Sequence, residues 1–231
     1  MVFNPKLRGQ PVIVLSNNDG CVVSRSPQAK AIGIQMGEPA FKIRHLIQAH
    51  QVQVFSSNYS LYGDLSQRVM TTLAAFTPEQ EIYSIDEAFL DLSGFRHLDL
   101  IRYGQQIRDT VLQWTGVPIS IGIAPTKTLT KIAGDIAKKQ SSGVFVLPHC
   151  PDDILAEFPI ADIWGIGRSH RRSLQAHGIT NALQLRDASL DWARREYSVV
   201  MQRLVLELRG QPCFNLELVP PSKKSITVSR S

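Results

Sequence analysis

Between residues 59 and 147 the hydrophobic pattern alternates between two periods, and this restricts the fold more than any other feature of the chain. In Tyr59–Phe76 apolar residues recur every three or four positions, which indicates a helix. Glu81–Leu92 has the period of extended structure, with an interruption near its centre. A second helix is expected to begin after Asp99 as N-cap and to end at Gly116.

The following segment continues this alternation. Ile119–Ile123 alternates isoleucine with small residues as a strand does, Thr126–Lys139 has helical spacing, and Val144–Leu147 is a short apolar strand. The order is therefore α-β-β-α-β, then α-β. A ferredoxin-like, split βαβ sheet runs β-α-β-β-α-β, so we expect an α+β fold whose leading strand lies upstream of residue 1.

The net positive charge lies in the C-terminal part of the chain. Residues 1–160 contain 14 lysines and arginines and 14 acidic residues, whereas residues 161–231 contain 11 basic and 6 acidic residues and carry the whole net charge of +5. Localised positive charge suits a polyanion such as nucleic acid. A solvated basic surface is equally compatible with the charge alone.

Composition excludes several classes of protein. No apolar stretch approaches the roughly 20 residues that cross a bilayer, and no apolar segment typical of a signal peptide follows the start, so we expect no membrane partner. The cysteines, Cys21, Cys150 and Cys213, are far apart and form no CxxC pair. Their spacing fits a reducing cytoplasm and indicates neither a zinc site nor a disulfide framework.

The acidic pair Asp86-Glu87 is the first candidate site. Strand alternation would make Asp86 the one charge on a largely apolar face with Ile82 and Leu90, where a bound cation would compensate it. Glu87 would face the other way unless the chain turns here and makes the pair a hairpin tip. Clustered carboxylates can hold the two divalent ions that phosphoryl transfer to a hydroxyl uses. A solvated hairpin tip has the same sequence, so the pair alone leaves both interpretations open.

Two further segments offer groups for phosphate. The helix at Thr126–Lys139 carries an apolar face, and Lys127, Lys131 and Lys138 cluster on the opposite face. Near the N-terminus, a hydroxyl and cations follow the strand Val12–Leu15 and a polar turn; they are Ser24, Arg25 and Lys30. An amphipathic surface helix and a polar loop would have the same patterns.

A glycine-containing segment near residue 165 resembles a helix-hairpin-helix motif. Gly165 and Gly167 allow backbone N–H groups to approach a phosphate closely, and the helix that follows adds donors and a favourable dipole. Arg168, Arg171 and Arg172 lie on its first turns. Such a motif contacts the nucleic-acid backbone without distinguishing sequence.

Taken together, these segments resemble the Y-family translesion DNA polymerases, and most closely their UmuC branch. The resemblance covers almost the whole chain, and the Ser-Asn-Asn-Asp-Gly-Cys stretch favours the UmuC branch over the DinB branch. Its carriers are Leu15–Cys21, Ala29–Gly33, Ser56–Tyr59, Tyr83–Phe89, Gly122–Ala124, Thr126–Leu129 and Trp164–Gly167.

The resemblance implies three domains and a set of site residues. Fingers are expected at residues 1–56, an incomplete ferredoxin-like palm at 57–158, and a helical thumb with the start of a linker at 159–231. Two Mg²⁺ ions, a dNTP and primer-template DNA are the implied ligands. The residues implied for them are Asp86 and Glu87 for metal and catalysis, Ser24, Lys30 and Lys138 for the nucleotide, and Lys127, Lys131, Gly165, Ile166, Gly167 and Arg168 for DNA.

The resemblance also carries expectations about activity. The family has a first strand with a metal-binding aspartate and a C-terminal little-finger domain, which we do not find in these 231 residues, so we expect little polymerase activity from this chain alone. The implied role is error-prone synthesis in the SOS response with UmuD′ (cleaved UmuD) and RecA. The alternative is a non-catalytic DNA-binding remnant that uses the thumb. A nucleotide cyclase is disfavoured because no GG[DE][DE]F signature occurs.

Overall fold

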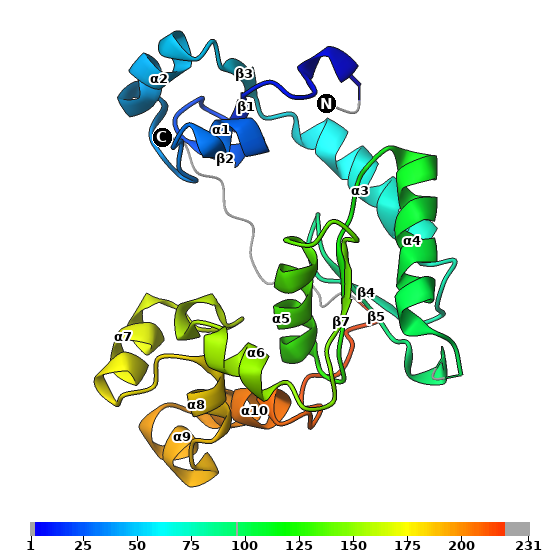
Figure 1. Ribbon diagram of the computed structural model, residues 1–231, viewed down its shortest axis with the longest axis vertical. Helices are drawn as coiled ribbons and strands as arrows, with labels where there is room; N and C mark the ends of the chain where they lie inside the picture. Colours follow the sequence, from blue (N-terminus) through cyan, green and yellow to red (C-terminus); the bar gives the residue numbers. More distant parts are fainter. Residues whose placement is uncertain (1–2, 96, 220–231) are drawn as a thin grey trace. The chain divides into compact units, whose positions relative to one another are not determined.

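The computed structural model (Figure 1) describes residues 3–95 and 97–219. These residues divide into two compact units. The first unit ends at Arg68 and the second begins at Val69, within helix α3 (Tyr59–Leu73). The fingers, palm and thumb boundaries remain predictions. The expected start of a linker falls in residues 220–231, outside the described residues.

The first unit is built on a three-stranded sheet in the order β2-β1-β3. β1 (Val12–Leu15) is antiparallel to β2 (Val22–Arg25) and parallel to β3 (Gln53–Ser56). β1 is almost fully buried, as its apolar run predicts. The crossover to β3 contains α1 (Pro27–Ala31), a 3-10 turn at Ala40–Ile43 and α2 (Arg44–Ala49); another 3-10 turn lies at Pro5–Leu7. The core consists of Ile13, Leu15, Val22, Ala29, Ile34, Ile43 and Val52.

The polar turn between β1 and β2 contains a residue in the left-handed region. Asp19 has a φ of 54°, a conformation that aspartate and asparagine tolerate better than most side chains. Its N–H donates to the Ser16 carbonyl at 2.8 Å, and the Ser16 N–H donates to the Cys21 carbonyl at 2.8 Å. The turn therefore closes the β1-β2 hairpin.

The order of elements in the second unit confirms the predicted alternation. After α3 come β4 (Gln80–Ile82) and β5 (Ala88–Leu90), which are antiparallel, and then α4 (Leu100–Thr115). β6 (Ile121–Ile123), α5 (Lys127–Ala137) and β7 (Val144–Val146) follow, with β6 and β7 parallel. In Figure 1, α4 and α5 lie on opposite sides of these strands. The remaining 3-10 turn before α4 is Ser93–Phe95.

The strands of the second unit form two pairs, β4-β5 and β6-β7, among the described residues. Ala88 and Leu90 of β5 nevertheless pack against the same core as Ile121 of β6. That core consists of Val69, Met70, Leu73, Ile107 and Val111, from α3 and α4. Both pairs therefore contribute to one α/β core, while a continuous ferredoxin-like sheet remains a prediction.

Local signals explain where α4 begins and ends and how closely α5 packs. Asp99 accepts hydrogen bonds from the N–H groups of Ile101 and Arg102 at 3.0 and 3.2 Å, which confirms it as N-cap. Gly116 ends the helix at a φ of 72°. On β6, a Cβ added to Gly122 would lie 2.1 Å from the Gly134 nitrogen, so glycine is what lets α5 lie directly against this strand.

After residue 150 the regular structure is helical. Its elements are α6 (Asp152–Glu157), a 3-10 turn at Ile160–Asp162, α7 (Arg168–Ala176), α8 (Ala182–Arg186), α9 (Leu190–Glu196) and α10 (Val199–Leu208). They share a core with α5 that includes Leu129, Leu155, Leu174, Leu185 and Val205. None of the helices in the described ranges is both long and apolar enough to span a lipid bilayer.

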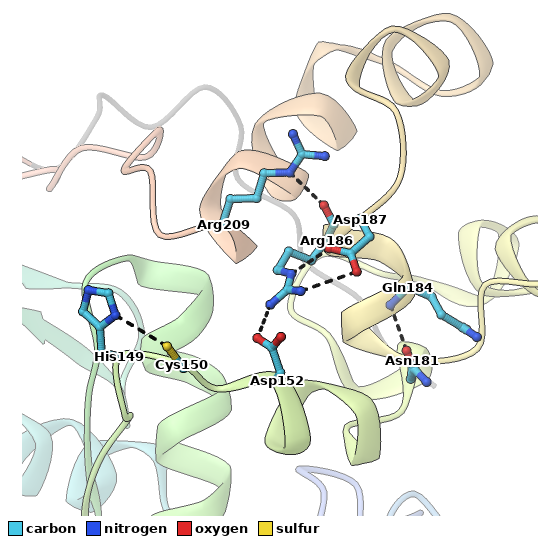
Figure 2. A network of polar contacts seen from close by, with 8 residues as sticks. All are labelled: His149, Cys150, Asp152, Asn181, Gln184, Arg186, Asp187 and Arg209. Atoms are coloured by element: carbon cyan, nitrogen blue, oxygen red, sulfur yellow. Dashed lines mark hydrogen bonds and ion pairs between the residues drawn. The ribbon is translucent and has the colours of Figure 1, made fainter.

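Arg186 joins three of these helices (Figure 2). Its guanidinium donates to Asp152 of α6 at 2.5 Å and to the adjacent Asp187 at 2.9 Å. Arg209, at the end of α10, donates to the carbonyls of Arg186 and Ala188 at 2.8 Å each. The hydrogen bond from Arg186 lowers the pKa of Asp152 below its usual value, and both carboxylates raise the pKa of Arg186.

Candidate active site and glycine loop

Asp86 and Glu87 lie in the turn that joins β4 to β5. The N–H groups of Tyr83 and Ser84 both donate to the Glu87 carbonyl at 3.0 Å. The predicted reversal at the acidic pair is therefore confirmed. Asp86 is exposed, and its Oδ1 accepts a hydrogen bond from the Ser84 hydroxyl at 2.7 Å. The turn thus exposes the Asp86 carboxylate to solvent, next in sequence to Glu87.

The expected apolar face around Asp86 is wrong. Strand alternation stops at Tyr83, because its N–H and the next one share a single acceptor in the turn. Ile82 is 61% exposed, and the buried carboxylate of the hairpin is Glu81, at 5%. Asp86 therefore owes its availability to the turn and not to burial against apolar side chains.

Glu81 forms an internal ion pair with Lys127, the first residue of α5. Their side chains are only 7% and 10% exposed. The Lys127 ammonium also donates to the Asn215 carbonyl at 2.8 Å, and Glu81 accepts from the Glu217 N–H at 2.8 Å. Lys127, predicted to contact DNA, is thus engaged within the fold.

Lys131, one turn along α5, pairs with Glu87 at 2.8 Å. Its ammonium also lies 4.5 Å from the ring centre of Tyr83, 5.4 Å from that of Phe89 and 6.0 Å from that of Trp164. The side chain is 20% exposed. The carboxylate of the turn and three aromatic rings therefore surround one cation.

The remaining predicted nucleotide-contacting residues are exposed. Lys138 follows α5, is 62% exposed, and pairs with Asp135 at 3.2 Å. Ser24 on β2 and Lys30 on α1 belong to the first unit, and both are exposed there. The three lysines predicted on the polar face of the helix differ in their surroundings: the ammonium groups of Lys127 and Lys131 contact the β4-β5 hairpin, whereas Lys138 is exposed.

The glycine segment forms a tight loop before α7, as predicted. Gly165 has a φ of 87°, a value that favours glycine, and Gly167 is the N-cap of α7. Ile166 is 9% exposed and anchors the loop in the helical core, while both glycines and Arg168 are exposed. The Ile166 N–H donates to the Ile163 carbonyl at 3.0 Å, so the two glycines and the N-terminus of α7 are the accessible backbone of this loop, beside an arginine.

Trp164 connects this loop to the carboxylate turn, a contact that the sequence analysis missed. Its Nε1–H donates to the Tyr83 hydroxyl at 3.0 Å, and its ring centre lies 5.7 Å from that of Tyr83 and 5.6 Å from that of Phe214. The residues are far apart in sequence. No local signal could have indicated the contact beyond the presence of a tryptophan beside the glycines.

The carboxylates of the turn are oxygen ligands of the kind that divalent cations such as Mg²⁺ bind. Mg²⁺ is bound by hard oxygen ligands, commonly one or two carboxylates with water and substrate phosphates in the remaining positions. Asp86 and Glu87 supply two such carboxylates. Across residues 3–95 and 97–219 no group of three or more His, Cys, Asp or Glu side chains could hold a metal. The remaining ligands would therefore come from outside this pair.

Comparison with known proteins shows the family. The impB/mucB/samB family model matches residues 1–135. The chain is 49% identical to Protein UmuC of Salmonella typhimurium over 236 residues and 47% identical to Protein ImpB of the same organism over 237. Each alignment covers 100% of this chain and 56% of the relative. The chain therefore spans little more than half the length of these relatives.

Solved structures agree with this assignment. The insertion ternary complex of Dbh DNA polymerase has a TM-score of 0.79 at 25% identity, covering 94% of this chain and 64% of that one. DinB from Sulfolobus solfataricus has a TM-score of 0.72 at 26% identity, covering 90% and 61%. The chain belongs to the impB/mucB/samB family, the UmuC-type branch of the Y-family DNA polymerases.

Proposed function

We propose that this chain forms part of an error-prone translesion DNA polymerase, adding dNTPs to a primer opposite a damaged template. The observation that carries the proposal is the turn between β4 and β5, where Asp86 is exposed and adjoins Glu87. Membership in a polymerase family supports it. Fingers at residues 1–56, palm at 57–158 and thumb from 159 are the domains that we assign on the same grounds.

In this proposal Asp86 and Glu87 would hold Mg²⁺. A divalent ion bound there would promote attack by the primer 3′-hydroxyl and stabilise the departing pyrophosphate. Asp86 needs no rearrangement to bind, because its second oxygen has no hydrogen-bond partner among the described contacts. To bind the metal ion, the Glu87 carboxylate must either leave the Lys131 ammonium or contact both cations. Asp86 is therefore the first ligand and Glu87 the second.

Three side chains are proposed as contacts of the incoming nucleotide's triphosphate, each considered within its own unit. In the first unit Lys30 would neutralise phosphate charge and the Ser24 hydroxyl would donate a hydrogen bond, and in the second unit Lys138 would neutralise phosphate charge. Exposure of all three side chains supports this assignment. Among the described residues, the ion-pair partner of Lys138 is the exposed i,i+3 carboxylate of Asp135, and such pairs are weak enough to be displaced by phosphate.

Primer-template DNA is assigned to the loop and the start of α7. Gly165, Ile166 and Gly167 would approach a phosphate through the backbone, and Arg168 would add a charge-assisted contact. The short α6 and the longer α7 on either side support a helix-hairpin-helix that binds without sequence preference. The internal ion pairs of Lys127 and Lys131 favour this loop over α5 as the main DNA contact.

The similarity of this chain to a DNA polymerase in an insertion ternary complex supports DNA and dNTP as ligands. We propose UmuD′ and RecA as protein partners, because the resemblance to the UmuC branch implies them. A role on chromosomal DNA in the SOS response would place the protein in the cytoplasm.

Nucleotide binding tests the catalytic part of the proposal without requiring turnover. A fluorescent dNTP should bind the protein on primer-template DNA in the presence of Mg²⁺, and Asp86→Asn should weaken it at least about tenfold, or about 1.4 kcal/mol. Asp91→Asn, which alters a nearby carboxylate outside the turn, is the matched control. Equal dNTP affinity with and without Asp86 would contradict the assignment.

The same experiment distinguishes a polymerase from the alternative function, a non-catalytic DNA-binding module. If duplex DNA binds with strong salt dependence but no dNTP binding depends on Mg²⁺ or Asp86, the chain acts as a DNA-binding module through the thumb. Primer extension by these 231 residues is expected to be slow, because among the described residues no further carboxylate joins Asp86 and Glu87 in a group that could hold metal. Fast synthesis that survives Asp86→Asn would show that another carboxylate performs the chemistry.

A further inference from the structure

The contacts of Lys131 connect two sites that the proposed function treats separately. One side of its ammonium faces Glu87 of the carboxylate turn, at 2.8 Å. The other contacts are the rings of Tyr83, Phe89 and Trp164. Trp164 immediately precedes Gly165, the first glycine of the loop assigned to DNA. Lys131 therefore lies between the proposed metal ligands and the proposed phosphate contact.

The aromatic rings form a continuous cluster in which the cation is embedded. The ring centres of Tyr83 and Phe89 are 5.7 Å apart, and those of Phe89 and Trp164 are 6.2 Å apart. The Trp164 Nε1–H also donates to the Tyr83 hydroxyl. Tyr83 itself donates its backbone N–H to the Glu87 carbonyl. A displacement of Trp164 would therefore be transmitted to the turn through Tyr83 as well as through Lys131.

Energetics favour a fixed position for this lysine. A partly desolvated cation over an aromatic face contributes more than an exposed one, and its ion pair with Glu87 adds a charge-assisted contact. The side chain is only 20% exposed, and a DNA phosphate would compete with Glu87 for the ammonium. Geometry thus argues that Lys131 acts through Glu87 and Trp164 and not by contacting phosphate.

We propose that Lys131 is a positioning residue that holds the Glu87 carboxylate and the Trp164-Gly165 loop in a fixed relation, so that DNA binding at the loop and metal binding at the turn are coupled. This inference rests on the proposed function, since it assigns no new ligand. It differs from the sequence-based prediction, in which Lys131 itself contacts DNA.

The salt dependence of DNA binding separates the two roles. A lysine that neutralises one phosphate contributes about 0.9 to the slope of log Kd against log salt. Lys131→Met should weaken binding of a primer-template duplex about three- to tenfold, the equivalent of a partly buried cation-π contact, with the slope unchanged. Lys131→Arg, which retains a cation able to stack on the rings, should restore most of the affinity.

A double substitution tests whether the effect of Lys131 on DNA binding depends on Trp164. If Lys131 acts through Trp164, then Lys131→Met should have little further effect in a Trp164→Leu background. Lys139→Met removes an exposed charge from the same segment without any aromatic contact and is the matched control. Should Lys131→Met fail to fold, Tyr83→Phe removes the hydroxyl that accepts from Trp164 and should likewise weaken binding at constant slope.

The outcomes are distinct. A slope reduced by about 0.9 would make Lys131 a direct phosphate contact. Full additivity of Lys131→Met and Trp164→Leu would show that Lys131 does not act through Trp164. Either result would overturn the positioning role. Failure of the unsubstituted protein to bind duplex DNA at low salt would instead refute the proposed function. Weaker binding at constant slope, rescued by arginine and absent in the Trp164→Leu background, supports the positioning role. A gain in duplex affinity on adding Mg²⁺ that Lys131→Met abolishes supports the coupling, and a gain that Lys131→Met leaves unchanged would contradict it.

Discussion

Glu207 of α10 offers a stringent test of how the second unit is held together. Its side chain is fully buried, with an exposure of 0%. Oε2 accepts from the Thr128 N–H at 3.0 Å, in the first turn of α5, and Oε1 accepts from the N–H groups of Cys213 and Phe214 at 2.6 and 3.2 Å. One carboxylate therefore fixes α10, the start of α5 and the segment after α10.

The substitution Glu207→Gln removes part of this arrangement while it preserves the volume of the side chain. The amide oxygen can still accept from Cys213 and Phe214, but an NH₂ group then faces the Thr128 N–H. A hydrogen bond to a charged group is worth about 1.5–3 kcal/mol, and a buried donor left without a partner costs about 1–3 kcal/mol. We therefore expect a loss of about 2–4 kcal/mol in the free energy of unfolding.

Urea unfolding followed by tryptophan fluorescence measures this loss. The tryptophans, Trp114, Trp164 and Trp192, all belong to the second unit, so the signal reports that unit. The control is Glu196→Gln, an exposed glutamate on α9, which should change stability by less than about 0.5 kcal/mol. A similarly small loss for Glu207→Gln would refute the reasoning that its carboxylate organises three segments.

Further predictions concern packing, pH and the loop. In urea unfolding, Gly122→Ala should destabilise the protein by about 1–3 kcal/mol because the added Cβ would meet the backbone of α5. Gly134→Ala should stabilise it by about 0.5–1 kcal/mol, because the added Cβ would lie in open space. The hydrogen bond from Arg186 lowers the pKa of Asp152 in the folded state. The stability that this ion pair adds to the fold is therefore fully present above the unfolded pKa of about 3.9, and it is lost as the pH falls through the folded-state pKa. Asp152→Asn should thus reduce stability near neutral pH and make no difference in strong acid. Gly165→Ala, at a left-handed φ, should raise the Kd for duplex DNA about tenfold, whereas an unchanged Kd would show that the loop geometry is not used.

Local signals explain why the elements could be predicted from the sequence. Asp99 and Gly116 delimit α4 because capping depends on the residue itself and its immediate neighbours. The reversal at Asp86-Glu87 was predictable because the pair interrupts an otherwise extended segment. The apolar face of α5, with Leu129 and Ile132 buried, follows from helical spacing alone.

The side-chain partners could not be predicted because they join residues far apart in sequence. Glu81 and Lys127 are 46 positions apart, and Tyr83 and Trp164 are 81 apart. A pattern analysis assigns a lysine on the polar face of a helix to solvent or to a ligand. Only the fold reveals that the hairpin supplies Glu81 and Glu87 to Lys127 and Lys131.

Metal binding at the β4-β5 turn is the most direct measurement of the central claim. Mn²⁺ added to the ¹⁵N-labelled protein with a dNTP should broaden the amide resonances of Ser84–Ala88 first, through paramagnetic relaxation. Asp86→Asn should abolish this selective broadening while the rest of the spectrum stays unchanged. Broadening that centres on another part of the chain, or that persists in the Asp86→Asn protein, would contradict the assignment of this turn as the catalytic metal site.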